Sequence, residues 1–229
     1  MYPTSTKSGP DSSGPPPYYA RSEVSNSDLT ELKNLLYPSF QPGDREKAFR
    51  FGTLVDAMIT EPERVRYDRR TVDGETCSGE DWLLAEEMKK SLRREAKSDN
   101  FLKYVLENAE TQKTSIRSGQ EFEYGNFKYT LDTRCKWDWW IGALGFGGDL
   151  KTTAAATRQQ FDECVDYFDW DRSRAWYMDI VRSSRDFIYA ISKKNCRVFK
   201  LMIERDSGIY RRGREKYGDL AFKWWQLIE

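Results

Sequence analysis

The chain contains no histidine among its 229 residues. Histidine is the usual general base near neutral pH, the commonest metal ligand in proteins and the central member of serine–histidine–aspartate triads. Its absence excludes the histidine-containing forms of these three sites. Any catalytic site in this chain must therefore be built from other groups, such as carboxylates and lysines.

Cysteine is also scarce. The four cysteines, Cys77, Cys135, Cys164 and Cys196, are widely and irregularly spaced, and no CxxC pair occurs. A zinc ribbon or a cysteine-ligated iron–sulfur cluster needs closely spaced cysteines, so neither is expected. We expect four reduced thiols in a cytosolic protein.

Long apolar runs are missing as well. No segment approaches the ~18 apolar residues that a membrane span requires, and the sequence shows no signal peptide. These two absences predict a cytoplasmic protein without a membrane partner.

The chain has no excess charge of either sign. Lys plus Arg and Asp plus Glu each number 37, which gives a net charge of zero. Any nucleic-acid binding must therefore come from local patches. Aromatic residues make up 14% of the chain and include eight tryptophans, enough to supply a core despite the modest apolar content.

Composition divides the chain into two parts. Residues 1–22 are rich in Pro, Ser and Gly and nearly free of aliphatic side chains, which predicts a disordered tail. Residues 23–229 show no internal linker and are expected to form one domain. Its first helix begins at Ser25 or Ser27, either of which can act as the N-cap.

The apolar periodicity then changes along the domain. Helical spacing predicts helices over residues 25–37, 45–63 (ended by Pro62), 79–97, 157–168, 169–183 and 208–229, and alternation predicts strands over residues 121–124, 127–130, 134–142, 145–153, 186–194 and 197–205. Leu29, Leu32, Leu35 and Leu36 are expected on the inward side of the first helix. This order predicts an α/β (mixed α+β) fold, with a central mixed sheet flanked by helices.

Charged residues gather near one predicted strand pair. In "GFGGDLKTT", Asp149 and Lys151 are two positions apart, so on a strand both point to the same side. Asp138 lies in the preceding strand, and adjacent strands can bring the two carboxylates to one edge. Gly147 and Gly148 are expected to let a substrate backbone approach closely.

Two carboxylates beside a lysine suit metal-assisted phosphodiester hydrolysis. Carboxylate oxygens favour Mg²⁺ or Mn²⁺, and Lys151 can position water or neutralise charge on the phosphoryl oxygens. The alternative is a set of solvated ion pairs at the edges of the strands. Asp138 favours the site, because an acid among three tryptophans needs a partner.

The motifs resemble a known family. "RCKWDWW" followed by "GGDLKTT" resembles the core of the PD-(D/E)XK nuclease superfamily, in its phage exonuclease VIII-like branch related to RecB-type nuclease domains. "VSNSDLTELK", "FGTLVDAMITEPE" and "DWDRSRAWYMD" resemble that branch's N-terminal helix, its first core helix and the helix after the catalytic strands. The resemblance spans roughly residues 23 to 226.

This resemblance implies a restriction-endonuclease-like core and a Mg²⁺-dependent deoxyribonuclease. The implied activity is an exonuclease that processes double-stranded DNA ends in phage-type homologous recombination, alongside a single-strand annealing protein, in the cytoplasm of a bacterial host cell. Asp138 and Asp149 would bind the metal, the Leu150 carbonyl would be a neutral ligand, and Lys151 would act in the chemistry.

The sequence departs from the family at two positions. Asp56 replaces the family's helix histidine, and it is either a residue at the surface boundary or an additional metal ligand. Ser173 replaces a glutamine, and its shorter side chain weakens either a nucleotide contact or the positioning of water. Glu61 matches a family acid, and both a direct role and a surface position at the helix end stay open.

Several residues are candidates for DNA binding. Arg172, Ser173, Arg174 and Tyr177 lie in the motif after the catalytic strands, and Tyr177 and the tryptophans could either stack on bases or pack in the core. Further candidate phosphate contacts are Lys193, Lys194, Arg211, Arg212, Arg214 and Lys216, for which a solvated helix face is the alternative.

Two rival functions share these residues. One is a catalytically decayed nuclease fold that acts as a DNA- or protein-binding module, suggested by Asp56 and Ser173. The other is an endonuclease with the same site. The sequence decides neither the polarity of digestion nor whether the chain forms a homo-oligomer.

Overall fold

The computed structural model describes residues 18–38 and 44–228. Most of the predicted disordered tail, residues 1–17, lies outside this range. The remainder of that tail begins with a short 3-10 turn, η1 (Tyr18–Ala20). The guanidinium of Arg134 donates hydrogen bonds to the carbonyls of Arg21 and Glu23, so the chain is tied to the domain just before its first helix.

Helices and strands follow each other largely in the predicted order. The helices are α1 (Asn26–Leu36), α2 (Arg45–Thr60), η2 (Pro62–Arg64), α3 (Gly79–Glu95), α4 (Asn100–Asn108), α5 (Arg158–Tyr167), α6 (Trp170–Val181) and α7 (Gly208–Ile228). The strands are β1 (Val65–Arg66), β2 (Thr71–Val72), β3 (Glu75–Thr76), β4 (Glu110–Tyr124), β5 (Phe127–Ile141), β6 (Phe146–Thr153), β7 (Arg185–Ser192) and β8 (Val198–Glu204).

Local signals fix the ends of the first two helices. Ser25 caps α1, and its hydroxyl and backbone N–H form a capping box with Asp28. Asp44 caps α2 by accepting a hydrogen bond from the N–H of Lys47. Pro62 follows the end of α2 and starts the 3-10 turn η2, as the sequence predicted.

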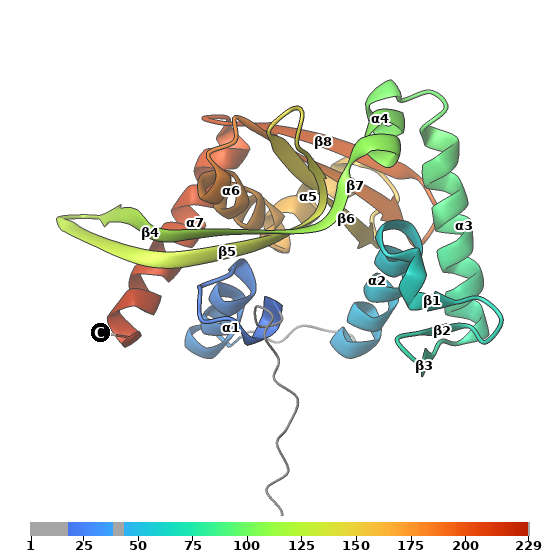
Figure 1. The fold of residues 1–229 in the computed structure, drawn as a ribbon, viewed down its shortest axis with the longest axis horizontal. Coiled ribbons are helices and arrows are strands. Elements are labelled where there is room, and N and C mark those ends of the chain that lie inside the picture. The colour runs from blue at the N-terminus through green and yellow to red at the C-terminus, as the bar shows by residue number, and fades with distance from the viewer. Residues whose placement is uncertain (1–17, 39–43, 229) are drawn as a thin grey trace, which may run out of the picture.

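The central sheet has five strands in the order β4-β5-β6-β7-β8. β6 and β7 are parallel, and the other neighbouring pairs are antiparallel. Figure 1 shows this mixed sheet flanked by helices, which confirms the predicted fold class. The small sheet β1-β2-β3 was not predicted, because its two-residue strands are too short to show a period. The helix α4 was not predicted either.

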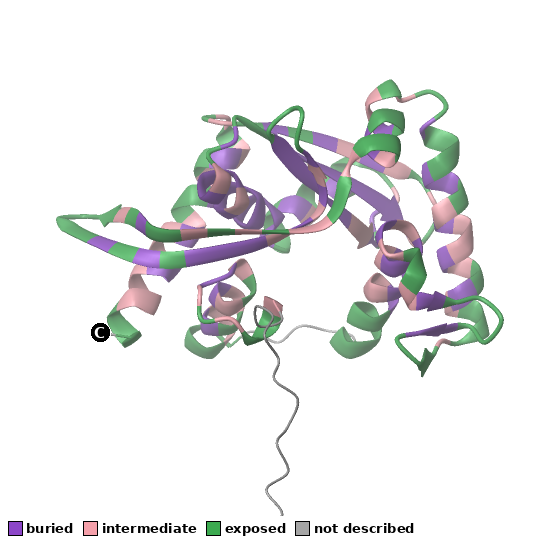
Figure 2. Cartoon of the chain, viewed as in Figure 1, coloured by how far each residue is buried: buried purple, intermediate pink, exposed green. Residues whose placement is uncertain are grey.

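Helices cover both faces of the sheet. A core on one side joins the sheet to α1, α5, α6 and α7, and a core on the other side joins it to α2, α3 and α4. β7 contributes to both: Ile188 and Ala190 belong to the first core, whereas Phe187 and Tyr189 belong to the second. Its nearly continuous apolar run is typical of a strand covered on both faces, and Figure 2 shows the strand as buried.

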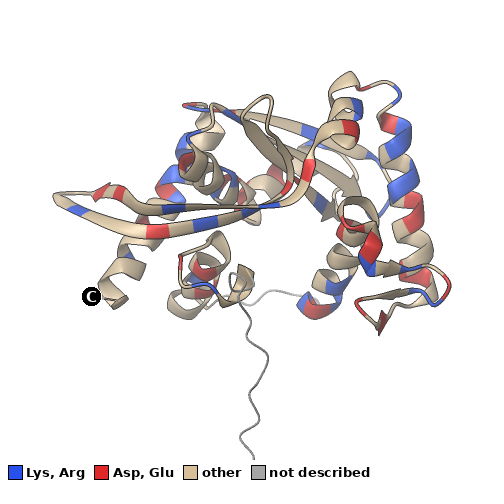
Figure 3. Cartoon of the chain, viewed as in Figure 1, with Lys and Arg blue, Asp and Glu red and all other residues tan. Residues whose placement is uncertain are grey.

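The hairpin of β4 and β5 projects beyond the rest of the sheet (Figure 1). Its turn is at Gly125, which has a φ of +59°, and Asn126, as predicted. The strands predicted separately over 127–130 and 134–142 form one continuous strand, β5. Charges of both signs lie along the hairpin, whereas on α3 acids occupy the first turn and most lysines and arginines lie toward the C-terminal end (Figure 3).

Three further observations complete the comparison with the predictions. Leu29 and Leu32 of α1 are buried, but Leu35 is 80% exposed, so its expected inward position is wrong. All four cysteines are free thiols. None of the helices in the described residues combines the length and the apolar character that a membrane crossing requires.

Candidate active site

The candidate site forms where β5 and β6 stop pairing. Their antiparallel ladder runs from Ile141↔Phe146 to Trp139↔Gly148 and ends there. The next position in the same register would place Asp138 opposite Asp149. Instead of a ladder pair, the N–H of Leu150 donates a hydrogen bond of 2.7 Å to Oδ2 of Asp138. The two carboxylates therefore lie together at a point where the strands diverge.

Lys151 and Arg174 hold the second carboxylate between them. The ammonium of Lys151 forms an ion pair with Oδ2 of Asp149, as expected for residues two positions apart on a strand. Arg174, on α6, lies 3.6 Å from Oδ1 of Asp149 and 3.7 Å from Asp186. Asp149 and Arg174 are 4% and 1% exposed, so this is a buried charge cluster beneath the site.

Asp56 joins the site from α2. The hydroxyl of Thr60 donates a hydrogen bond of 2.9 Å to Oδ1 of Asp56, and the amide of Gln112 donates one of 3.2 Å to Oδ2. Asp56 lines the same cleft as Asp138 and Lys151. The structure therefore places Asp56 on the cleft, and its role as a metal ligand stays a prediction.

Burial and the neighbouring charges shift the pKa values of the three carboxyl groups. Burial raises the pKa of Asp138 well above its ordinary value, and the charges of Asp149 and Asp56 raise it further. Burial also raises the pKa of Asp56. Burial acts on Asp149 in the same direction, but Arg174 and Lys151 outweigh it and lower the pKa of this carboxyl.

Lys151 keeps its charge in this environment. Burial works to lower the pKa of its ammonium group, but Asp149 and Asp138 more than compensate, and the pKa is raised. The side chain remains 31% exposed to solvent. A charged lysine at the edge of a carboxylate cluster can therefore reach a bound anion.

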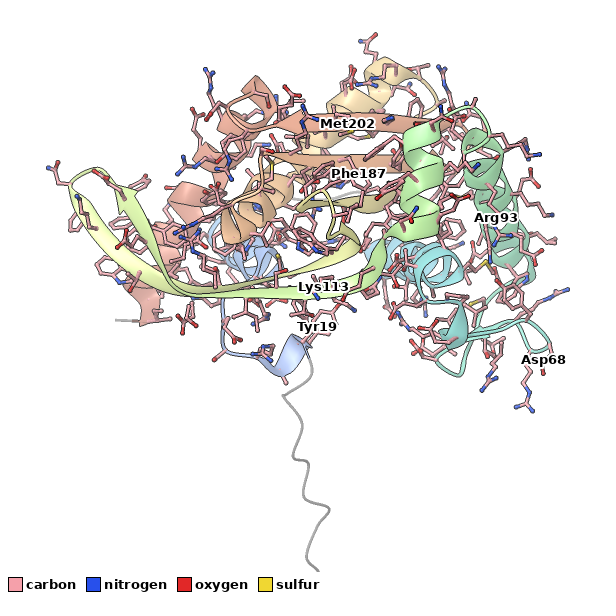
Figure 4. The ribbon with its side chains drawn as sticks, turned by 45° about the horizontal axis from the view of Figure 1, so that its top comes forward. Tyr19, Asp68, Arg93, Lys113, Phe187 and Met202 are labelled. Carbon is pink, nitrogen blue, oxygen red and sulfur yellow. The ribbon has the colours of Figure 1, made fainter. Side chains whose placement is uncertain are left out.

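The site opens into a cleft of about 1620 Å³. Its walls come from α2, from the ends of β5 and β6, and from α5 with the start of α6. Tyr19, labelled in Figure 4, also lines the cleft. Four aromatic side chains on the cleft are largely exposed: Tyr19 (79%), Phe49 (73%), Tyr167 (64%) and Phe168 (53%).

The donor atoms suit a hard divalent cation. Asp56, Asp138 and Asp149 are carboxylates that repel each other, and a cation between them would relieve that repulsion. The site is not preassembled, however: across the described residues no group of three or more Asp, Glu, Cys or His side chains is placed to share a metal ion. A metal ion would therefore compete with the ammonium of Lys151 for the carboxylate of Asp149. The carboxylate of Asp56 already accepts hydrogen bonds from Thr60 and Gln112.

Leu150 contributes its backbone to the site. Its N–H is bound to Asp138, and its side chain is buried in the core beneath α2, α3 and α4. Glu61, at the end of α2, lines the cleft and forms an ion pair with Arg64.

The arginines predicted to contact DNA are buried. Arg172 is 2% exposed and links α6 to α1 through hydrogen bonds to Asn26 (3.0 Å) and Thr30 (2.5 Å). Arg174 is bound to the acids below the site, as described above. The prediction of phosphate contacts is therefore corrected for both residues: in this structure each guanidinium is occupied inside the protein.

Ser173 and Tyr177 are also directed inward. The Ser173 hydroxyl donates to the carbonyl of Trp170 and accepts from Arg174. The Tyr177 ring packs edge-on against Trp137, at 5.1 Å between centroids, and Arg174 lies over its face at 4.0 Å. Both are thus placed to support Arg174, and core packing accounts for Tyr177 where base stacking was the other alternative.

The remaining candidate cations fall into two groups. Lys193 and Lys194 line the cleft, and the Lys193 ammonium lies 4.5 Å from the centre of the Phe51 ring. Those on α7 lie elsewhere: Arg212 and Lys216 pair with Asp171, and Arg211 and Arg214 line a separate groove of about 1390 Å³. Only the first group shares the cleft with the carboxylates.

Gly147 and Gly148 serve packing and not access. A Cβ on Gly147 would lie 2.4 Å from the ring of Trp137, and one on Gly148 would lie 2.2 Å from the ring of Phe187. Figure 4 shows Phe187 inside the sheet. The expectation that these glycines admit a substrate backbone is therefore wrong, because buried aromatic rings fill the space above them.

The sequence analysis missed three polar residues of the site: Gln112, Thr60 and Asp186. Thr60 lies four positions after Asp56 on a helix, a spacing that could have indicated the contact. Gln112 and Asp186 gave no such signal, since they reach the site from β4 and β7 through tertiary contacts.

Comparison with known proteins gives distant similarities of fold. No family model and no curated protein matches the chain. A solved structure of a protein from Eubacterium rectale, named "Putative exonuclease", is 19% identical, with a TM-score of 0.48, over 82% of this chain and 68% of that one. A phage-related exonuclease from Haemophilus somnus 129PT is 10% identical, with a TM-score of 0.42, over 89% of this chain and 83% of that one. Identities and TM-scores this low do not establish that this chain shares the activity of either protein.

Proposed function

We propose that the chain is a Mg²⁺- or Mn²⁺-dependent deoxyribonuclease, acting as an exonuclease on double-stranded DNA ends. One observation carries the proposal. Asp138 of β5, Lys151 of β6 and Asp56 of α2 line one cleft, and the buried carboxylate of Asp149 pairs with Lys151 directly behind it. Two or more carboxylates with a charged lysine form the arrangement that metal-assisted phosphodiester hydrolysis requires.

Asp138, Asp149 and Asp56 would hold the metal ion, with the Leu150 carbonyl as a neutral ligand. When bound, the ion supplies charge that polarises the phosphate and lowers the pKa of water. The oxygen-only donor set, in a chain without histidine, supports Mg²⁺ or Mn²⁺ over softer metals.

The other residues have distinct tasks in this proposal. Lys151 stays charged and holds either the attacking water or a phosphoryl oxygen, which stabilises the negative charge of the transition state. Arg174 keeps Asp149 ionised from below. The Leu150 N–H fixes the orientation of Asp138.

The size and lining of the cleft support a polymeric substrate. Its volume of about 1620 Å³ exceeds the roughly 300–1,000 Å³ of sites for small molecules. Lys193 and Lys194 can meet phosphates, and the exposed rings of Phe49, Tyr167 and Phe168 can stack on bases. A role in phage-type recombination alongside a single-strand annealing protein belongs to the same proposal and is supported by the sequence resemblance.

The test is digestion of end-labelled linear duplex DNA and of closed circular duplex DNA, each with Mg²⁺ and with excess EDTA. Metal-dependent loss of the linear substrate alone supports an exonuclease. Cleavage of the circle would assign an endonuclease instead. Activity that survives EDTA, or that is unchanged in Asp138→Asn, would overturn the assignment of the site.

A non-catalytic DNA-binding module is the second candidate. It is favoured by the partners that the carboxylates already have, since Asp149 is bound to Lys151 and Asp56 to Thr60 and Gln112. Calorimetric titration with Mn²⁺ separates the two candidates. An intact site binds the ion and loses affinity in Asp149→Asn, whereas a decayed one shows no binding in either protein.

A further inference from the structure

Gln112 has an unusual backbone conformation for a residue inside a strand. It lies in β4 with a φ of +55°, in the left-handed region that disfavours residues with a Cβ. Its neighbours pair normally, Thr111 with Trp139 and Lys113 with Trp137. Gln112 alone in this stretch leaves the ladder, and it does so opposite Asp138.

The side chain of Gln112 reaches the third carboxylate of the site. Its amide nitrogen donates to Oδ2 of Asp56 at 3.2 Å and to Oγ1 of Thr60 at 2.9 Å. Thr60 in turn donates to Oδ1 of Asp56 at 2.9 Å. Each oxygen of Asp56 therefore accepts one hydrogen bond, and the donors come from two different elements.

The two observations concern the same residue. The register of β4 with β5 is the same on both sides of Gln112, so the distortion is confined to this one position. Strained backbone persists only where its surroundings enforce it, and it gathers at functional sites. Here the strain coincides with a contact to a carboxylate in the cleft.

We propose that Gln112, together with Thr60, is a positioning residue that orients the Asp56 carboxylate toward Asp138 and Asp149. The inference rests on the proposed function, in which Asp56 is a metal ligand. Hydrogen bonds that orient ligating carboxylates contribute about 10- to 100-fold to metal affinity. The remaining lone pairs of Asp56 stay available while its rotation is restricted.

The test is calorimetric titration of the metal-free protein with Mn²⁺ alone, for the wild type, Gln112→Gly and Gln112→Ala. Both variants remove the amide, but only glycine relieves the backbone strain. We expect both to bind Mn²⁺ at least about 10-fold more weakly, and Gln112→Gly to have the higher thermal midpoint of the two. Unchanged affinity in both variants would overturn the inference.

Thr60 offers a matched pair of control variants. Thr60→Ser keeps the hydroxyl and should retain wild-type affinity, whereas Thr60→Val keeps the shape and should lose affinity as the Gln112 variants do. If Thr60→Ser and Thr60→Val bind Mn²⁺ equally well, positioning by hydrogen bonds is refuted for this residue.

Two further variants separate failure of the inference from failure of the proposed function. If Asp56→Asn weakens Mn²⁺ binding but Gln112→Gly does not, the inference alone is wrong. If the wild type binds no Mn²⁺, or Asp56→Asn binds it as tightly as the wild type, then Asp56 is not a ligand and both fail. In the double variant Asp56→Ala/Gln112→Gly, the metal-free thermal midpoint should differ from the sum of the single effects, because the two side chains interact directly.

Discussion

The N–H of Leu150 donates a hydrogen bond of 2.7 Å to the carboxylate of Asp138 and not to a backbone carbonyl of β5. Asp138 lies one position beyond Trp139, which forms the last β5–β6 ladder pair with Gly148. The hydrogen bond to Asp138 lets the two strands diverge without leaving the amide unsatisfied. The divergence separates the strands at the position where Asp138 and Asp149 face each other. A side chain of the candidate site therefore also maintains the opening in which the site lies.

Lys151→Ala should separate binding from chemistry. Loss of the ammonium removes stabilisation of the transition state, so we expect turnover to fall by roughly 10²- to 10⁴-fold. Mn²⁺ affinity should be kept or increased, because the ion no longer competes with Lys151 for Asp149. Single-turnover cleavage and Mn²⁺ titration measure the two effects. Lys128→Ala, on the hairpin outside the cleft, is the control. If Lys151→Ala cleaves DNA at the wild-type rate, Lys151 has no role in the chemistry.

Asp56→Asn should lower Mg²⁺ affinity and cleavage while leaving the metal-free protein as stable as the wild type or more stable. The reason is that burial raises the pKa of this carboxyl, so its charge is disfavoured in the folded state. Asp56→His should retain partial activity and shift preference toward Mn²⁺, because imidazole suits transition metals better. Thermal unfolding in EDTA and metal titration check both variants. An unchanged Mg²⁺ affinity in Asp56→Asn would leave Asp138 and Asp149 as the only carboxylate ligands.

Arg174→Met tests whether this arginine is structural. The substitution leaves the buried, ionised carboxylate of Asp149 with Lys151 but without its second cation, which should cost up to about 3–5 kcal/mol of unfolding free energy. Lys194→Met is the matched control, since Lys194 is exposed on the cleft and should change stability by less than about 0.5 kcal/mol. Urea denaturation measures both. If Arg174→Met is nearly as stable as the wild type, Arg174 is not needed for the fold, and DNA binding is again its predicted role.

Asp186 should impose a pH dependence on stability. It is fully buried, and burial, with a smaller contribution from Asp149, raises its pKa well above the ordinary value despite the opposing charge of Arg174. Between the unfolded pKa of about 3.9 and the raised folded value, the folded state holds a proton that the unfolded state has lost. The unfolding free energy should therefore fall as pH rises through this window.

Asp186→Asn is the variant that measures this effect. It mimics the protonated carboxyl at every pH, so its stability should decline less steeply with rising pH than that of the wild type. Denaturant titrations at several pH values, all in EDTA, give the two slopes. Parallel slopes would show that Asp186 does not titrate differently in the folded and unfolded states.

Features carried by local sequence could be predicted. The stop at Pro62 and the Gly125–Asn126 turn depend on neighbouring residues and agree with the prediction, and Ser25 is one of the two caps that the sequence offered. The contact of Lys151 with Asp149 follows from the period of a strand.

Features set by tertiary contacts could not be predicted. The sequence predicted that the arginines of α6 contact DNA, but Arg172 finds partners on α1 and Arg174 finds them on β6 and β7. The hydrogen bond of Gln112 to Asp56 joins β4 to α2, and nothing in the residues next to Gln112 indicates it or the left-handed backbone. Both cases involve contacts between elements far apart in the sequence.

The irregular backbone of β4 has a consequence for how the protein behaves in concentrated solution. β4 is an edge strand of the central sheet, and a long, regular edge is a template for pairing with another chain. Gln112 interrupts the regular conformation near one end, and a register shift between Arg117 and Gln120, with Gly119 at a φ of +58°, interrupts it in the middle. Lys113 and Arg117 lie in the stretch from Gln112 to the register shift, and Glu110, Glu121 and Glu123 lie outside it. The same distortion that directs Gln112 toward Asp56 thus also protects the sheet against edge-to-edge aggregation.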